Sequence, residues 1–104
     1  MNLKNSDLRR AQLQHARLEH ADFDGACLQR ANFEQAHLEE VSLYNANLWG
    51  AIFIEAHLEG AYLWEVCFSY VLLGMAHLEK AYLVDAKFEK TLLAGAHLDG
   101  TKLM

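Results

Sequence analysis

The chain has 104 residues, of which 53% are apolar, so it is long enough for one domain with a buried core. Its net charge of −5 at pH 7 argues against direct binding of nucleic acid, because contacts to phosphates need clustered Lys and Arg. It holds no apolar run of the roughly 18 residues that a membrane-spanning helix needs, and its polar start lacks the apolar segment of a signal peptide. Its two cysteines, Cys27 and Cys67, provide no disulfide framework, so we expect a protein of the reducing cytoplasm that does not bind a membrane.

A period of five residues runs through the whole chain. From Leu3 to Leu103, every fifth residue is Leu or Phe, with 16 Leu and 5 Phe at the 21 positions. Two residues before these central positions the side chain is nearly always small, and 14 of these residues are Ala. The pattern predicts a single domain over residues 1–104 whose interior is a column of Leu and Phe.

A backbone that bends once in every repeat explains this period. In a straight α-helix, steps of about 100° per residue would spread the central residues around the whole circumference, and in a strand an odd spacing would alternate them between two faces. A quarter turn in each repeat places every central residue inside, together with the small residue two positions earlier. The fifth residue then lies at the bend, where Gly tolerates unusual backbone angles, as at Gly25, Gly50 and Gly60.

The repeat resembles that of the pentapeptide-repeat family, most closely in Ala21-Asp22-Phe23-Asp24-Gly25, Ala31-Asn32-Phe33 and Ala46-Asn47-Leu48. The resemblance covers the entire chain and implies an all-β fold, a right-handed quadrilateral β-helix with four repeats per coil. At 20 residues per coil, the 104 residues form about five coils, and no capping helix is evident. We expect the core to include the central residues Phe23, Phe33, Leu38, Leu43, Leu48, Phe53, Leu58, Leu63, Phe68, Leu73, Leu78 and Leu83.

A second period of twenty residues supports coils of four repeats. The segment Ala36-His37-Leu38-Glu39 recurs as Ala56-His57-Leu58-Glu59, Ala76-His77-Leu78-Glu79 and Ala96-His97-Leu98-Asp99. Stacked coils have four outer faces, which we number by the central residues of the second coil. Face one is centred on Phe23, face two on Leu28, face three on Phe33 and face four on Leu38, each with the residues twenty positions before and after.

Face four combines histidines with acidic residues. Its outward positions stack His37, His57, His77 and His97 beside Glu19, Glu39, Glu59, Glu79 and Asp99. Imidazole and carboxylate groups bind zinc and similar ions, so the four histidines are candidate metal ligands. A straight column of ligands about 4.8 Å apart does not enclose a tetrahedral ion, however. The simpler interpretation is a solvated acidic stripe with no metal and no cofactor.

Face three changes from polar to apolar along the chain. Its outward residues begin with Gln12 and Asn32 and become hydrophobic from Ile52 onward. A contiguous exposed apolar surface usually marks an interface, most simply that of a two-fold homodimer. A different protein partner fits the same residues, and ordinary packing between neighbouring coils is the alternative. The predicted interface consists of Ile52, Ile54, Leu72, Met75, Leu92 and Ala94, with Trp49 and Tyr70 nearby on face two.

These observations favour a protein that is not an enzyme. The sequence shows no Ser/His/Asp or Cys/His group that could act as a nucleophile with its base. Outward residues on a convex rod also form no cleft for a substrate. We therefore predict a protein-interaction or scaffold module that self-associates through face three. The family resemblance implies an alternative, since some members imitate duplex DNA and bind DNA gyrase, and the net charge of −5 suits that role. Metal binding by face four is a further alternative.

Overall fold

The backbone turns at every fifth residue throughout residues 1–103, which the computed structural model describes. From Asn5 to Gly100, each fifth residue has a positive φ, between 54° and 72°. The following N–H donates to the carbonyl of the central residue, as from Ala26 to Phe23 at 2.9 Å. A positive φ at the third of four residues is the arrangement of a type II turn. Five of these bends hold Gly and fifteen hold other residues, which adopt the left-handed region at some cost.

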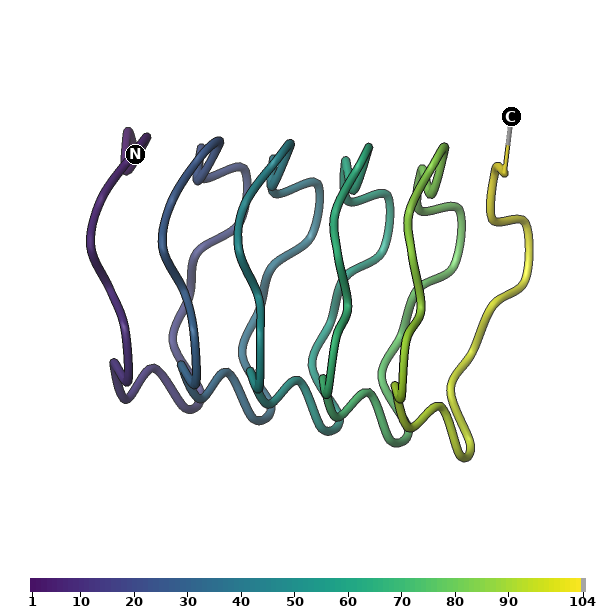
Figure 1. Ribbon diagram of the computed structural model, residues 1–104. Helices are drawn as coiled ribbons and strands as arrows, with labels where there is room; N and C mark the ends of the chain where they lie inside the picture. The colour runs from purple at the N-terminus through teal and green to yellow at the C-terminus, as the bar shows by residue number, and fades with distance from the viewer. Residues whose placement is uncertain (104) are drawn as a thin grey trace.

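Four turns bring the chain back over itself after twenty residues. Parallel bridges join the residue before each central position to its counterpart in the next coil, from Asn2 and Asp22 to Tyr82 and Lys102. Backbone hydrogen bonds follow the same register, since the N–H of Phe23 donates to the carbonyl of Ser42 at 2.8 Å. The twenty-residue coil expected from the second period is therefore present. Figure 1 shows the coils stacked along one axis, with the two ends of the chain at opposite ends of the stack.

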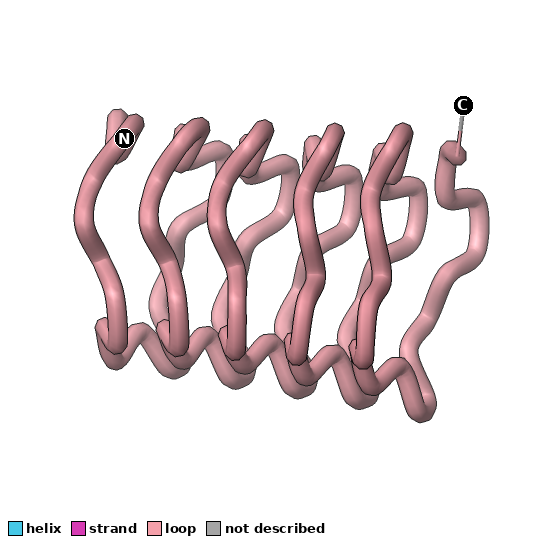
Figure 2. The backbone as a smooth tube through the Cα atoms, viewed as in Figure 1, coloured by secondary structure: helices cyan, strands magenta, loops and turns pink. Residues whose placement is uncertain are grey.

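Each side of a coil is very short. One bridge residue stands on each side, and residues 1–103 contain neither a helix nor a longer strand, as Figure 2 shows. It follows that none of these residues belongs to a helix able to cross a membrane. The extended segments expected of a β-helix are reduced to single bridges, because the turn occupies two of every five residues.

Central and small residues fill the interior of the coils. All twelve central residues named above are 0–4% exposed, and residues 1–103 bury no polar or charged side chain. Aromatic rings continue from coil to coil, since Phe33 stacks on Phe53 and Phe68 on Phe88 with ring centroids 4.9 and 4.8 Å apart. Because the interior is uniformly apolar, the polar chemistry of the described residues lies on the outer faces.

Candidate functional site

Four imidazoles form a ladder along face four. Bridges join His37 to His57, His57 to His77 and His77 to His97, so the same side chain recurs at the same place in successive coils. The rings stack with centroids 4.9, 4.8 and 4.6 Å apart and planes within 5° of parallel. The ladder arises because in-register parallel bridges place residues twenty positions apart directly above one another.

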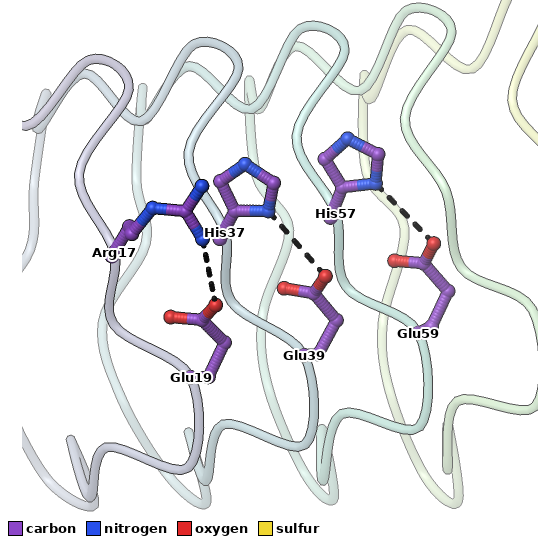
Figure 3. A network of polar contacts seen from close by, with 6 residues as sticks. All are labelled: Arg17, Glu19, His37, Glu39, His57 and Glu59. Carbon is purple, nitrogen blue, oxygen red and sulfur yellow. Dashed lines mark hydrogen bonds and ion pairs between the residues drawn. The ribbon is translucent and has the colours of Figure 1, made fainter.

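A carboxylate accompanies each of the first three imidazoles. The Nδ1 atoms of His37, His57 and His77 lie 3.4, 3.3 and 3.4 Å from an Oε2 atom of the glutamate two residues later. In the first coil, Arg17 replaces the histidine and contacts Glu19 at 3.4 Å. Figure 3 shows the pairs of Arg17, His37 and His57 side by side on neighbouring coils. The distances are at the long end for hydrogen bonds, so the pairs are weak as simple hydrogen bonds.

The second oxygen of each carboxylate is not satisfied. The Oε1 atoms of Glu39, Glu59 and Glu79 reach neither solvent nor a hydrogen-bond donor among residues 1–103. Burial raises the pKa of Glu79, but its own backbone N–H, the contact with His77 and the charge of His97 lower it by more. The pKa of Glu79 therefore lies below its ordinary value, and the carboxylate is ionised at neutral pH.

The carboxylates approach imidazoles of two successive coils. One ligand atom each of His57, Glu59 and His77 lie within 4.8 Å of one another, and the same holds for His77, Glu79 and His97. A third group contains Glu19, His37 and Glu39. The glutamates form a second column beside the imidazoles, so the ligand atoms of each group do not lie on one straight line.

The apolar residues predicted on face three form one surface. Ile54, Leu72, Met75, Leu92 and Ala94 line a shallow depression of about 310 Å³. Ile52 precedes Leu72 and Leu92 in the same column of bridges and does not line the depression. We call the depression and its lining residues the apolar patch. The residues are unequally covered, since Ile54 and Leu72 are half-buried whereas Met75 and Leu92 are 54% and 61% exposed.

Trp49 and Tyr70 lie together but outside the apolar patch. Their ring centroids are 5.4 Å apart, and each ring has a cation over it, Arg30 at 5.3 Å and Lys90 at 5.5 Å. Trp49 lines a different depression on face two, next to Cys67. Neither ring lines the depression formed by the face-three residues predicted with them.

Sequence reasoning missed Gly74, which also lines the apolar patch. The other five glycines sit at bends with positive φ, whereas Gly74 precedes a bend and has no such angle. Gly74 stands between Ile54 and Ala94 in the stack of coils, and no side chain covers the depression at its position. The signal was present in the sequence, since Gly74 is the one glycine out of step with the period of five.

Comparison with known proteins identifies the repeat. The profile described as "Pentapeptide repeats (8 copies)" matches residues 2–40 and 42–73. Among curated proteins, none matches the chain. Among the similar crystal structures, two align at 30% identity over at least 95% of this chain. HetL from the cyanobacterium Nostoc, a pentapeptide repeat protein involved in heterocyst differentiation regulation, aligns with a TM-score of 0.78 over 96% of this chain and 50% of HetL. A pentapeptide repeat protein of the Arabidopsis thaliana thylakoid lumen aligns with a TM-score of 0.76 over 95% of this chain and 66% of its own.

The chain spans only half to two thirds of the length of these relatives. Trypsin-treated QnrB1, a plasmid-mediated fluoroquinolone resistance protein, aligns at 17% identity with a TM-score of 0.45, over 96% of this chain and 58% of QnrB1. This similarity is too low to bear on the gyrase alternative, which stays a hypothesis.

Proposed function

The chain belongs to the pentapeptide-repeat family, and we propose that it is a non-catalytic protein-interaction module that associates through the apolar patch of face three. From the same membership we infer that the coils wind as a right-handed quadrilateral β-helix. The proposed partner is a second copy of the chain, related by a two-fold axis. A cytoplasmic location remains part of this proposal.

The exposure of Met75 and Leu92 carries the proposal. In the first two coils the column that contains Leu92 holds Gln12 and Asn32, so this face tolerates polar side chains. The later coils instead place Ile52, Leu72 and Leu92 in this column, where Leu92 is 61% exposed. Met75 at a nearby bend is 54% exposed. Because Met75 and Leu92 are each only 54–61% exposed, removing either from water would contribute about 1–2 kcal/mol, roughly half the value for burying a fully exposed side chain.

The chemistry of the patch suits a second copy better than a substrate. Its lining contains no titratable group, so two patches face each other without the repulsion expected from a chain of net charge −5. A shallow depression without an acid, a base or a nucleophile also lacks the parts that catalysis requires. Neighbouring coils already cover Leu72 in part, which is the ladder packing considered above, but Met75, which has a coil on either side, stays 54% exposed.

Light scattering during size-exclusion chromatography tests this proposal with a matched pair of variants. We expect the wild-type protein to have the mass of a dimer and Leu92→Glu to have that of a monomer, because a buried unpaired carboxylate opposes association. Gln12→Glu adds the same charge in the same column outside the patch and should remain dimeric. A monomeric wild-type protein at all concentrations, or a dimeric Leu92→Glu variant, would refute the proposal.

A further inference from the structure

We propose that face four binds one divalent transition-metal ion of the zinc type, at either of two overlapping sites that share His77. The first site consists of His57, Glu59 and His77, and the second of His77, Glu79 and His97. Two imidazoles and a carboxylate are a donor set that zinc accepts, with one position left for water. The inference is independent of the association proposed for face three.

The spacing of nitrogen and oxygen matches the ion. Bonds of about 2.0–2.1 Å to zinc place two ligand atoms of a tetrahedron about 3.3 Å apart. The Nδ1 and Oε2 atoms are 3.3 Å apart in His57 and Glu59, and 3.4 Å apart in His77 and Glu79. Each pair therefore already has the separation of two tetrahedral ligands, although it is long for a hydrogen bond.

Each carboxylate has an imidazole as its one cationic partner among the described residues and keeps one oxygen without a hydrogen bond. The buried Oε1 atoms of Glu59 and Glu79 have no hydrogen-bond donor, and an unpaired buried oxygen of an ionised group is unfavourable. No lysine or arginine pairs with either carboxylate in residues 1–103, where each has only its own imidazole within ion-pair distance. A divalent ion between Nδ1 and Oε2 would not reach Oε1, but it would balance the negative charge of the carboxylate more strongly than the imidazole 3.3–3.4 Å away does.

The third ligand comes from the next coil. Stacked rings of His57 and His77 have centroids 4.8 Å apart, which exceeds the edge of a zinc tetrahedron, so one ring must turn about its side-chain bonds to bind. The imidazole rings have room to turn, because they border an open groove of about 380 Å³. The side chains of His37, His57 and His77 are 31–34% exposed.

The shared histidine sets the stoichiometry. Both sites use His77, and ions in adjacent coils would lie about 4.8 Å apart and repel each other. Occupation of one site therefore disfavours the other, and we expect one ion per chain. The group of Glu19, His37 and Glu39 offers a single imidazole and should bind zinc more weakly.

Titration of the metal-free protein with Zn²⁺ in a calorimeter, and with Co²⁺ by visible absorption, tests the proposal. The wild-type protein should bind one equivalent of Zn²⁺ and show the intense bands of tetrahedral Co²⁺. His57→Gln and His97→Gln should each keep one equivalent with about twofold weaker affinity, because one of two sites remains. His77→Gln should weaken binding at least ~10-fold, since it removes a ligand from both sites.

Control variants separate this site from adventitious binding. His20 lies 3.2 Å from Glu40 but belongs to no three-residue group, so His20→Gln should bind like the wild-type protein. Circular dichroism would check the fold of His77→Gln, and the double variant Glu59→Gln/Glu79→Gln should lose binding with all rings intact. Absence of binding in the wild-type protein, equal binding by His77→Gln, or loss of all binding in His57→Gln would overturn the proposal.

Discussion

At the scale of single residues, the bends and the apolar patch use glycine for different reasons. Gly60 has a φ of +67°, and a Cβ atom there would lie 3.2 Å from Cγ of Glu40. Gly74 has no positive φ, and a Cβ atom would meet the carbonyl oxygen of Ala94 at 3.7 Å, an ordinary contact. Only the first position therefore depends on the backbone freedom of glycine.

Alanine substitution should affect these two glycines in opposite directions. We expect Gly60→Ala to lower the free energy of unfolding by about 1–2 kcal/mol, because an L-residue is strained at positive φ. Gly74→Ala should raise it by about 0.4–1 kcal/mol, because alanine restricts the unfolded chain without strain in the fold. Urea denaturation of both variants measures the difference. Equal effects would show that the two backbone positions are not distinct.

An exposed ion pair in the first coil gives a pH-dependent prediction. Arg9 donates to both carboxylate oxygens of Asp7, at 2.7 and 2.6 Å. These side-chain hydrogen bonds, followed by one from the Arg9 backbone, lower the pKa of Asp7 from 3.8 to about 2. Because folding lowers this pKa, any contribution to stability is present above pH 3.8 and disappears as the pH falls toward 2. We expect only a small effect on stability, since solvent screens an exposed pair.

NMR titration of the Asp7 carboxyl group tests this assignment directly. In the wild-type protein its pKa should be well below the ordinary value, and in Arg9→Ala it should return toward 3.8. An ordinary pKa in the wild-type protein would mean that the pair does not form in solution.

At the scale of the coil, stability depends on contacts between neighbouring coils. Phe53 is fully buried and stacks on Phe33 of the preceding coil, whereas Leu103 occupies the same kind of central position and is 66% exposed. We expect Phe53→Ala to cost about 3–5 kcal/mol and Leu103→Ala less than about 0.5 kcal/mol. Thermal unfolding of the two variants compares them, and similar losses would contradict a core that is built coil by coil.

The coil was predictable from the sequence because it depends on simple repetition. The buried column and the bends follow from residues within one repeat, and the stacking of His57 on His77 follows from the period of twenty. Local deviations were less predictable. Three turn or coil-to-coil hydrogen bonds lengthen to 3.4 Å, at Asn45, Val66 and Val71, and two of these positions hold valine where alanine is usual. The valine side chain alone does not account for the lengthening, because Val41 stands at the same kind of position and donates to Leu38 at 3.1 Å.

The candidate sites were predictable only in part. The columns of histidine and of apolar residues could be assigned to faces four and three from spacing alone. The orientation of Glu59, whose Oε2 meets His57 while Oε1 is buried, depends on side-chain rotamers and neighbouring coils. The contact of Arg30 with the ring of Trp49, which spacing places on face two, likewise depends on side-chain rotamers. Both features require three-dimensional contacts that sequence periodicity does not encode.

At the scale of the whole molecule, the interior is apolar in every coil, whereas the outer faces differ in chemistry. Faces three and four adjoin, and Met75 lines both the apolar patch and the groove beside the imidazole ladder. A second copy bound to face three would therefore lie close to the metal-binding residues proposed on face four. The two proposals remain separable, because Leu92 lines the patch but not the groove, so Leu92→Glu should bind zinc like the wild-type protein.

The central claim is that the chain associates through the apolar patch, and an NMR dilution series tests it most directly. Backbone amide shifts of the wild-type protein should change with concentration at Ile54, Leu72 and Leu92, while those of face one, opposite the patch, stay constant. In Leu92→Glu the same amides should be independent of concentration. Shifts that do not change on dilution, or that change only away from face three, would contradict the account.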